Sequence, residues 1–324
     1  MADITARGMK LGPQKKKKTF YSEFISQIDL QLMVIPSIIF IFIFSYIPMY
    51  GILMAFQEFQ MGDFPGFSKW EGFRQFELLF RDPNFPVMMR NTIVISLLKL
   101  AICFPAPIIL SIMLNEITNA SFKKSVQTIS YLPHFISWVV GATLLFDFFS
   151  PDNGGANYIL VSLGLLDKPI FFFGKGEYFW GMLVVTDIWK ELGWNAIIYI
   201  AAITSIDAEL YEAADIDGAG RFSKIWYITI ASILPTIILL FIFTVGGLLN
   251  ANFDQIMMLT NQMGNPSLRE FADVIDTYVF RAMRTQGDFS TATAIGLIQS
   301  VLGFIVVMIM NKVARKWDDS MGLF

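Results

Sequence analysis

The most pronounced pattern along the chain is a series of long apolar runs separated by polar stretches. A helix rises about 1.5 Å per residue, so roughly 20 apolar residues cross a hydrocarbon core about 30 Å thick. The runs of about this length are 31–56, 91–114, 129–150, 179–203, 227–249 and 291–311. The fourth is interrupted by Asp187, Lys190 and Glu191. Because strand-like alternation is absent, the pattern predicts an all-α integral membrane protein with six transmembrane helices.

The composition favours a membrane setting and excludes several other classes. Of the 324 residues, 55% are hydrophobic and 16% are charged, which is far from the average of soluble domains. The single cysteine, Cys103, can build neither an intrachain disulfide framework nor a cysteine-based metal site. The formal net charge of −3 gives no indication of nucleic-acid binding. Lipid is therefore the expected surrounding of most of the chain.

Basic residues near the two ends predict the orientation, because segments rich in Lys and Arg stay on the cytoplasmic side. They lie in segments 1–30 and 312–324 and are Arg7, Lys10, Lys15 to Lys18, Lys312, Arg315 and Lys316. The four consecutive lysines are also expected to contact anionic lipid headgroups. We therefore expect cytoplasmic N-terminal and C-terminal tails on either side of a six-helix domain over 31–311.

This orientation divides the loops between the two sides of the membrane. Loops 115–128 and 204–226 are predicted to face the cytoplasm. Loops 57–90, 151–178 and 250–290 are predicted to face outward, and in each of them acidic residues outnumber basic ones. That distribution agrees with the tendency of basic residues to stay inside.

Several prolines lie inside the expected spans. They are Pro36, Pro48, Pro105, Pro107, Pro133 and Pro235. Each removes a backbone donor and favours a kink, and neighbouring helices or water must then satisfy the freed carbonyl groups. Such kinks gather around cavities, but bends that only improve packing explain them equally well.

The cytoplasmic loop 204–226 contains "LYEAADIDGAG" (210–220), an acidic and helix-prone stretch. Taken as a helix, it places short side chains on one surface, which permits close approach by another protein. Two glycines provide an exit from the helix. A calcium-binding loop is excluded. If Gly218 were its central glycine, the first and twelfth ligand positions would be Ala213 and Lys224, and neither side chain can coordinate calcium. A solvated loop with incidental acids remains the simpler alternative to a docking surface.

The sequence "EAADIDGAG", followed by "ITIASILPTI", resembles the EAA loop of permease subunits in bacterial ABC importers. The segments "YLPHFISWVV" (131–140), "WKELGWNAIIYIAAI" (189–203) and "VIDTYVFRAM" (274–283) resemble the carbohydrate-uptake branch of that family. Within this branch the resemblance is to permeases for polysaccharide-derived oligosaccharides, including those for alginate. One position departs from the family pattern, since the proline expected after "ITI" is Ala231, although Pro235 follows.

The resemblance implies a MetI-like permease fold whose loop 204–226 seats in a cleft of an ATPase subunit. The residues that match the coupling motif are Glu212, Ala213, Ala214, Asp217 and Gly218. The implied partners are a second permease in a heterodimer, two ATPase subunits that carry ATP and Mg, and an extracytoplasmic solute-binding protein that docks on loop 250–290. The chain contains no G-x-x-x-x-G-K-[ST] phosphate loop. We therefore expect it to bind no cofactor and to be a transport subunit rather than an enzyme.

Polar side chains inside the spans are candidates for the substrate pathway, because ionisable groups are costly there unless they face a partner or a wet cavity. They are Lys99, Asp187, Lys190, Glu191, Trp194 and Asn195. An aromatic face beside charged and amide groups suits a sugar. An acidic substrate such as alginate would require cations, which Lys99 and Lys190 could supply. A network of Asp187, Lys190 and Glu191 that only holds helices together explains the same pattern.

Two other functional classes are less well supported. A self-sufficient secondary sugar carrier or channel would show repeated halves with discontinuous helices, and no internal repeat is evident. An intramembrane enzyme would need a nucleophile or a metal cluster, whereas Cys103 and His134 are far apart in sequence. We therefore expect no catalytic and no metal site, and we expect His134 to cap a helix or to lie at an interface.

Overall fold

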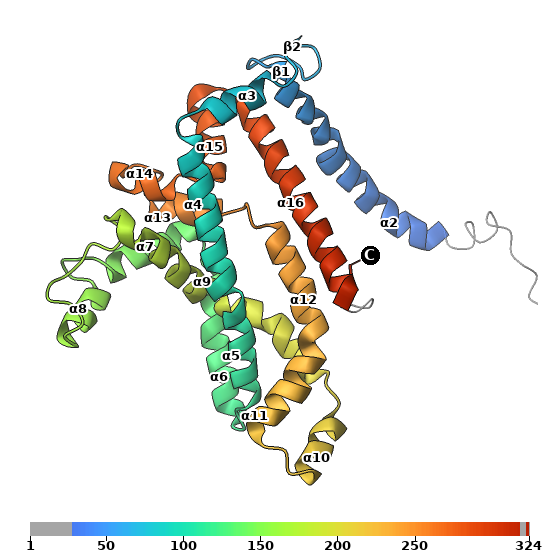
Figure 1. Cartoon of the computed structure of the whole chain (residues 1–324), viewed down its shortest axis with the longest axis vertical. Helices are drawn as coiled ribbons and strands as arrows, with labels where there is room; N and C mark the ends of the chain where they lie inside the picture. Colours follow the sequence, from blue (N-terminus) through green and yellow to red (C-terminus); the bar gives the residue numbers. More distant parts are fainter. Residues whose placement is uncertain (1–27, 318–321, 324) are drawn as a thin grey trace, which may run out of the picture. The chain divides into compact units, whose positions relative to one another are not determined.

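The computed structural model describes residues 28–317, 322 and 323, which are almost entirely helical (Figure 1). The basic segment expected at residues 1–30 lies mostly outside the described residues. The chain separates into two compact units, 1–51 and 52–324. The described part of the first unit consists of α2 (Ile28–Ile41), the π-helical turn η1 (Phe42–Tyr46) and the start of the 3-10 helix η2 (Ile47–Phe56).

The second unit begins with a short hairpin of β1 (Gln57–Glu58) and β2 (Lys69–Trp70), in which Gln57 lies opposite Trp70. Its helical elements, in chain order up to the long α9, are α3 (Arg74–Arg81), α4 (Phe85–Leu98), η3 (Lys99–Cys103), α5 (Pro105–Asn115), α6 (Ala120–Tyr131), η4 (Leu132–Phe135), α7 (Trp138–Phe148), α8 (Gly155–Ser162) and α9 (Gly176–Thr204). They are followed by α10 (Ala208–Ile216), α11 (Arg221–Lys224), η5 (Ile225–Ile230), α12 (Ala231–Gly246), α13 (Phe253–Leu259), α14 (Pro266–Ala272), α15 (Ile275–Arg281), η6 (Ala282–Gln286) and α16 (Phe289–Trp317).

Four helices in the described part of the chain are long and apolar enough to cross a membrane. They are Ile28–Phe56, Phe85–Asn115, Arg221–Gly246 and Phe289–Lys316. A fifth candidate span exists if Ala120–Phe135 and Trp138–Phe148 together form one broken span. The axes of these two helices are bent by 110° relative to each other. The six-helix count and the cytoplasmic termini therefore stay predictions.

The two expected spans that do not pass as straight apolar helices differ for physical reasons. The segment 129–150 is broken where Pro133 lies in η4 and Ser137 caps the N-terminus of α7 by accepting a hydrogen bond from the Val140 amide. Helix α9 is 29 residues long, but its charged side chains lower its apolar character. Asp187, Lys190 and Glu191 contact side chains or carbonyls of neighbouring elements.

Helix α9 forms the centre of the second unit and packs against α5, α6, α12 and α14. Its buried positions, among them Phe179, Leu183 and Thr186, recur at three- and four-residue spacing, as expected for one face of a helix. At Gly193 a Cβ atom would clash with the carbonyl oxygen of Ser130 in α6. The close approach of these two helices therefore requires glycine.

Two of the prolines, Pro105 and Pro235, follow local changes in helical winding. Phe104 donates its amide to the Lys99 carbonyl 3.1 Å away, which closes the wide turn of η3 immediately before Pro105. Because Pro105 has no N–H, the ladder of α4 cannot continue unchanged, and a π-helical turn absorbs the shift. Similarly, the π-helical η5 passes directly into α12, which begins at Ala231 and contains Pro235.

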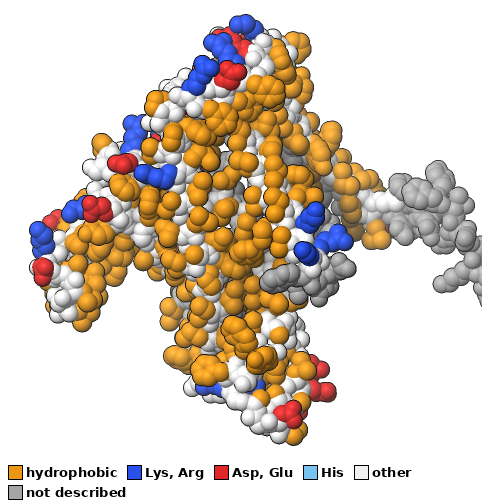
Figure 2. All heavy atoms as spheres, in the orientation of Figure 1, with side chains coloured by type: hydrophobic (Ala, Val, Ile, Leu, Met, Phe, Trp, Pro, Cys, Tyr) orange, Lys and Arg blue, Asp and Glu red, His pale blue; other side chains and the backbone are white. Residues whose placement is uncertain are grey.

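The surface of the second unit agrees with a lipid setting. On the face seen in Figure 2, hydrophobic side chains cover most of the long helices, and Lys, Arg, Asp and Glu gather near their ends. Exposed apolar residues on these helices include Ile109, Met113, Phe243 and Phe304. A soluble protein rarely exposes apolar patches of this extent.

Candidate functional site

The first candidate site is helix α10, which begins and ends with well-defined caps. The Asp207 carboxylate accepts a hydrogen bond from the Glu209 amide at 3.0 Å and caps the N-terminus. At the other end the Ala219 amide donates to the Ala214 carbonyl at 2.8 Å, and the Gly218 amide donates to the Asp215 carbonyl at 3.2 Å. This pair of bonds is a Schellman motif. Gly218 has a φ of +73°, which explains a glycine at this position.

The residues that match the coupling motif lie on the surface of this helix and its cap. Glu212, Ala213, Asp217 and Gly218 are exposed, and Ala214 is half-buried. The sequence pattern did not reveal the large apolar side chains beside them. Ile216 is 88% exposed and Phe222 is 87% exposed, so this end of the second unit carries an acidic and apolar surface.

Three contacts tie α10 and α11 to each other and to the rest of the second unit. Lys224 Nζ lies 2.6 Å from Asp215 Oδ1. The hydroxyls of Tyr211 and Thr229 lie 2.9 Å apart. Arg221 pairs with the carboxylate of Glu116, which follows α5. The two loops predicted to face the cytoplasm therefore meet at one end of the second unit (Figure 1).

The second candidate site is a cavity of about 310 Å³ where α4 passes into η3. Its wall includes residues of α5, α9 and α12 and of the turn before α13. Among the candidate pathway residues, Lys99, Asp187 and Asn195 line it. Lys99 Nζ lies 3.0 Å from Asp187 Oδ1 and also donates to the side-chain oxygen of Gln255. The structure thus joins two predicted site residues that are far apart in sequence.

The other three candidates lie at the break between α6 and α7. Lys190 is only 5% exposed and donates to the His134 carbonyl at 2.6 Å. Glu191 Oε2 lies 2.7 Å from His134 Nδ1. The Trp194 ring stacks on the His134 ring at a centroid distance of 4.1 Å. His134 therefore lies at an interface between elements.

Lys190 does not line the cavity in this conformation. Its ammonium is held by backbone carbonyls, by Glu191 at 3.5 Å and by the Trp138 ring at 5.6 Å. This geometry agrees in part with the alternative that a network of Asp187, Lys190 and Glu191 only holds helices together. Lys190 and Glu191 do contact each other, but Asp187 pairs with Lys99 instead. The contact of Lys190 with substrate stays a prediction.

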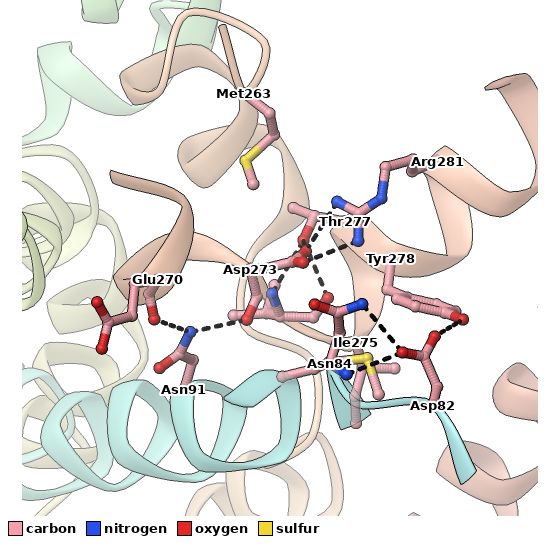
Figure 3. A network of polar contacts seen from close by, with 12 residues as sticks. Asp82, Asn84, Asn91, Met263, Glu270, Asp273, Ile275, Thr277, Tyr278 and Arg281 are labelled. Carbon is pink, nitrogen blue, oxygen red and sulfur yellow. Dashed lines mark hydrogen bonds and ion pairs between the residues drawn. The ribbon is translucent and has the colours of Figure 1, made fainter. Parts of the chain in front are cut away.

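A second polar cluster lies where α4 begins, and sequence reasoning missed it (Figure 3). Tyr278 donates its hydroxyl to Asp82 Oδ2 at 2.6 Å. Burial of Asp82 alone would raise the pKa of its carboxyl, but hydrogen bonds from Tyr278 and Asn84 outweigh that effect and leave the pKa below its usual value. The pKa of Tyr278 is raised by burial and by the same carboxylate.

The same cluster fastens the segment from α14 to α15 onto α4. Arg281 makes a two-pronged ion pair with Asp273 at 3.1 and 2.8 Å. The side-chain amide of Asn91 donates to the carbonyls of Glu270 and Asp273, each at 2.9 Å. The only sequence signal was the spacing of polar residues within "VIDTYVFRAM". Tyr278 meets Asp82, which lies 196 residues earlier, and Asn91 meets carbonyls 179 and 182 residues later, so local pattern could not reveal these contacts.

Within the described residues, no group of three or more His, Cys, Asp or Glu side chains comes together as metal ligands. The candidate sites thus consist of one surface helix, one cavity and two polar clusters. Their common feature is that each joins segments distant in sequence.

Comparisons with known proteins identify the family. Residues 103–319 match the family described as "Binding-protein-dependent transport system inner membrane component". Protein LplB of Bacillus subtilis (strain 168) is 41% identical, with 91% of each chain covered. The polygalacturonan/rhamnogalacturonan transport system permease protein YteP of the same organism is also 41% identical, with 94% of each chain covered.

Solved structures agree with this result. A chain in the crystal structure of a bacterial ABC transporter involved in the import of the acidic polysaccharide alginate has a TM-score of 0.83 and 37% identity, covering 92% of this chain and 99% of that chain. A second structure, of the bacterial alginate ABC transporter in complex with alginate pentasaccharide-bound periplasmic protein, has a TM-score of 0.82. The chain therefore belongs to the family of binding-protein-dependent transport system inner membrane components, the multi-pass permeases of ABC importers, as its sequence resemblance indicated.

Proposed function

We propose that this permease forms half of the translocation pathway of an ATP-driven importer for oligosaccharides or polysaccharides. The observation that carries the proposal is its similarity, over nearly the whole of both chains, to a permease of polygalacturonan and rhamnogalacturonan transport and to a chain of an alginate importer. Alginate is an acidic polysaccharide, which favours an acidic saccharide such as alginate as cargo here.

The loop 204–226 couples the permease to an ATPase subunit through Glu212, Ala213, Ala214, Asp217 and Gly218. The position of α10 supports this assignment, because its acidic and small residues are exposed at one end of the second unit. The contacts of Lys224 and Tyr211 connect α10 to the continuous helix 221–246. Leu240 and Thr244 of that helix line the cavity.

A displacement of α10 would therefore reach two walls of the cavity. The first route is the helix 221–246. The second is the ion pair between Arg221 and Glu116 at the end of α5, a helix that contributes Pro107 to the cavity wall. Rigid helices tied at their ends transmit such movements as rigid bodies, which suits a switch between inward-open and outward-open states.

The assembly in this proposal contains a second permease as a heterodimeric partner, two ATPase subunits that bind ATP and Mg, and an extracytoplasmic solute-binding protein. Loop 250–290 would receive the binding protein. The polar cluster around Asp273 supports this role, because it holds α14 and α15 in a defined place on α4. ATP hydrolysis belongs to the partner subunits.

The cavity at Lys99, Asp187 and Asn195 belongs to the saccharide pathway. Lys190, Glu191 and Trp194 would reach the saccharide only after the break between α6 and α7 rearranges, because their side chains are engaged there. A Lys190→Ala assembly tests this part. We expect reduced oligosaccharide-stimulated ATP hydrolysis and uptake, whereas unchanged values would remove Lys190 from the pathway.

Co-purification tests the proposed assembly as a whole. A tagged chain, extracted in mild detergent from cells that express the whole transport system, should co-purify with the ATPase subunits and with a second, different permease. Recovery of the chain alone or only with further copies of itself would contradict the heterodimeric importer. A self-sufficient carrier would give that result.

A further inference from the structure

The cavity contains a balanced pair of charges. Of the described residues that line it, only Lys99 and Asp187 are charged. Their side chains are each 15% exposed and lie 3.0 Å apart. The pair therefore contributes no net charge to the wall.

Gln255 holds Lys99 in this arrangement. Its buried amide group donates to the Leu183 carbonyl at 2.8 Å and to Thr186 Oγ1 at 2.9 Å. These two bonds turn the amide oxygen toward Lys99, which donates to it. The ammonium is thus engaged by acceptors from α9 and α13. A carboxylate entering the cavity would have to displace one of them before it could pair fully with Lys99.

The remaining polar wall is uncharged. Asn195, Thr244, Asn250 and Asn252 supply amide and hydroxyl groups. Ser96 also lines the cavity, and its hydroxyl is the one buried side-chain polar atom among the described residues that has no hydrogen-bond partner. A buried polar group without a partner is costly. The uncharged amide and hydroxyl groups of this wall suit a hydroxyl-rich chain that brings its own donors and acceptors.

We propose that Lys99 and Asp187 keep this chain's share of the cavity electrically neutral, so that it receives a saccharide through its hydroxyl groups and does not select for carboxylates. Selection for an acidic saccharide would then occur outside this cavity. The statement about saccharides rests on the proposed function, whereas the charge of the cavity can be measured without transport.

The single cysteine of the chain provides the probe, because Cys103 lines the same cavity. In the assembled transporter, its modification by two methanethiosulfonate reagents would be followed by mass spectrometry of this subunit. One reagent carries a sulfonate and the other a trimethylammonium group. The ratio of the two rates reports the local potential, because the ionisation of the thiol affects both rates equally and cancels.

The expected shifts have opposite signs. Lys99→Met leaves one negative charge and should favour the cationic reagent by roughly tenfold, and Asp187→Asn should favour the anionic reagent to a similar extent, as expected for a unit charge a few ångströms away in a partly wet site. The double variant Lys99→Met with Asp187→Asn should restore the wild-type ratio. Ser96→Ala, which changes no charge, is the matched control.

Two results would overturn the proposal. One is a single variant that leaves the ratio unchanged, and the other is a double variant that keeps the shift of one single variant. If a single variant does not assemble, the exchanged pair Lys99→Asp with Asp187→Lys keeps the net charge and should retain the wild-type ratio. If Cys103 does not react, Thr244→Cys on a Cys103→Ser background serves the same measurement.

Uptake by the reconstituted transporter tests the consequence for saccharides. Lys99→Met should reduce ATP-driven uptake of a uronate oligomer several-fold more than uptake of a neutral oligomer of the same length, and the double variant should remove that difference. A wild-type assembly that takes up neither oligomer would refute the proposed function and leave the labelling result standing. A double variant that loses uptake of the uronate oligomer but keeps uptake of the neutral oligomer would show that Lys99 selects carboxylates. That result would overturn the inference.

Discussion

At the scale of residues, backbone conformation and polar pairing explain several side chains of this permease. The backbone conformation at Gly218, with a φ of +73°, favours glycine. Lack of room is not the reason, because nothing lies within 4 Å of the position of a Cβ atom. Lys99 and Asp187 satisfy each other inside an apolar bundle. Tyr278 and Asp82 do the same at the start of α4. Each of these positions allows a test with a single substitution.

At Gly218, two substitutions separate strain from docking. Gly218→Ala should cost about 1 kcal/mol of local helix stability because of the left-handed backbone, and it should still assemble. Gly218→Leu adds bulk to the exposed surface and should abolish ATP-coupled uptake. Gly220, with a φ of −70°, is the control and should tolerate alanine. Intact assembly and uptake with leucine at position 218 would contradict the docking role of α10.

At Asp82, stability should depend on pH in a defined direction. A carboxyl whose pKa is lowered by folding stabilises the protein above its unfolded pKa, and that contribution disappears as the pH falls through the folded pKa. Tyr278→Phe removes one hydrogen bond to the carboxylate and should lower the stability by about 1 kcal/mol at neutral pH. The difference from wild type should narrow below about pH 3.8.

Thermal unfolding of the detergent-solubilised protein over a pH series measures this effect. Tyr158→Phe is the matched control, because the Tyr158 side chain is 77% exposed, and it should unfold like wild type at every pH. A Tyr278→Phe difference that is constant with pH would show that the Asp82 carboxylate does not contribute through this bond.

At the scale of elements, helix packing depends on a few close approaches. Gly193 in α9 faces the Ser130 carbonyl of α6, where a Cβ atom has no room. Gly193→Ala should push the two helices apart and lower the stability by about 1–3 kcal/mol. Gly181→Ala in the same helix meets nothing within 4 Å and should be nearly neutral. Thermal unfolding compares the two variants, and equal stabilities would refute this account of the α6–α9 contact.

Sequence reasoning predicted those elements whose signals are local. The apolar runs 91–114, 227–249 and 291–311 coincide with long apolar helices, and "LYEAADIDGAG" contains a capped helix that ends at glycine. It predicted a kink at Pro133, but not a bend as large as the 110° between Ala120–Phe135 and Trp138–Phe148. Nor did it predict that Lys99 pairs with Asp187, which lies 88 residues later in the sequence. Such pairs depend on how the helices assemble, and no local pattern encodes that.

At the scale of the whole molecule, the second unit connects a surface helix to a cavity. Helix α10 is tied by side-chain contacts to the helix 221–246 and, through Arg221 and Glu116, to the end of α5. Both of these helices contribute to the cavity wall. A movement imposed on α10 by a partner would therefore change the cavity. This connection supports the proposal that ATP hydrolysis in a partner subunit drives the permease.

The most direct test of the central claim is oligosaccharide uptake into liposomes. The account predicts uptake when this chain is reconstituted with its second permease, the ATPase subunits and the solute-binding protein, and only when ATP is supplied on the ATPase side. It also predicts no uptake by the chain alone. Saccharide uptake by the isolated chain without ATP would contradict the account.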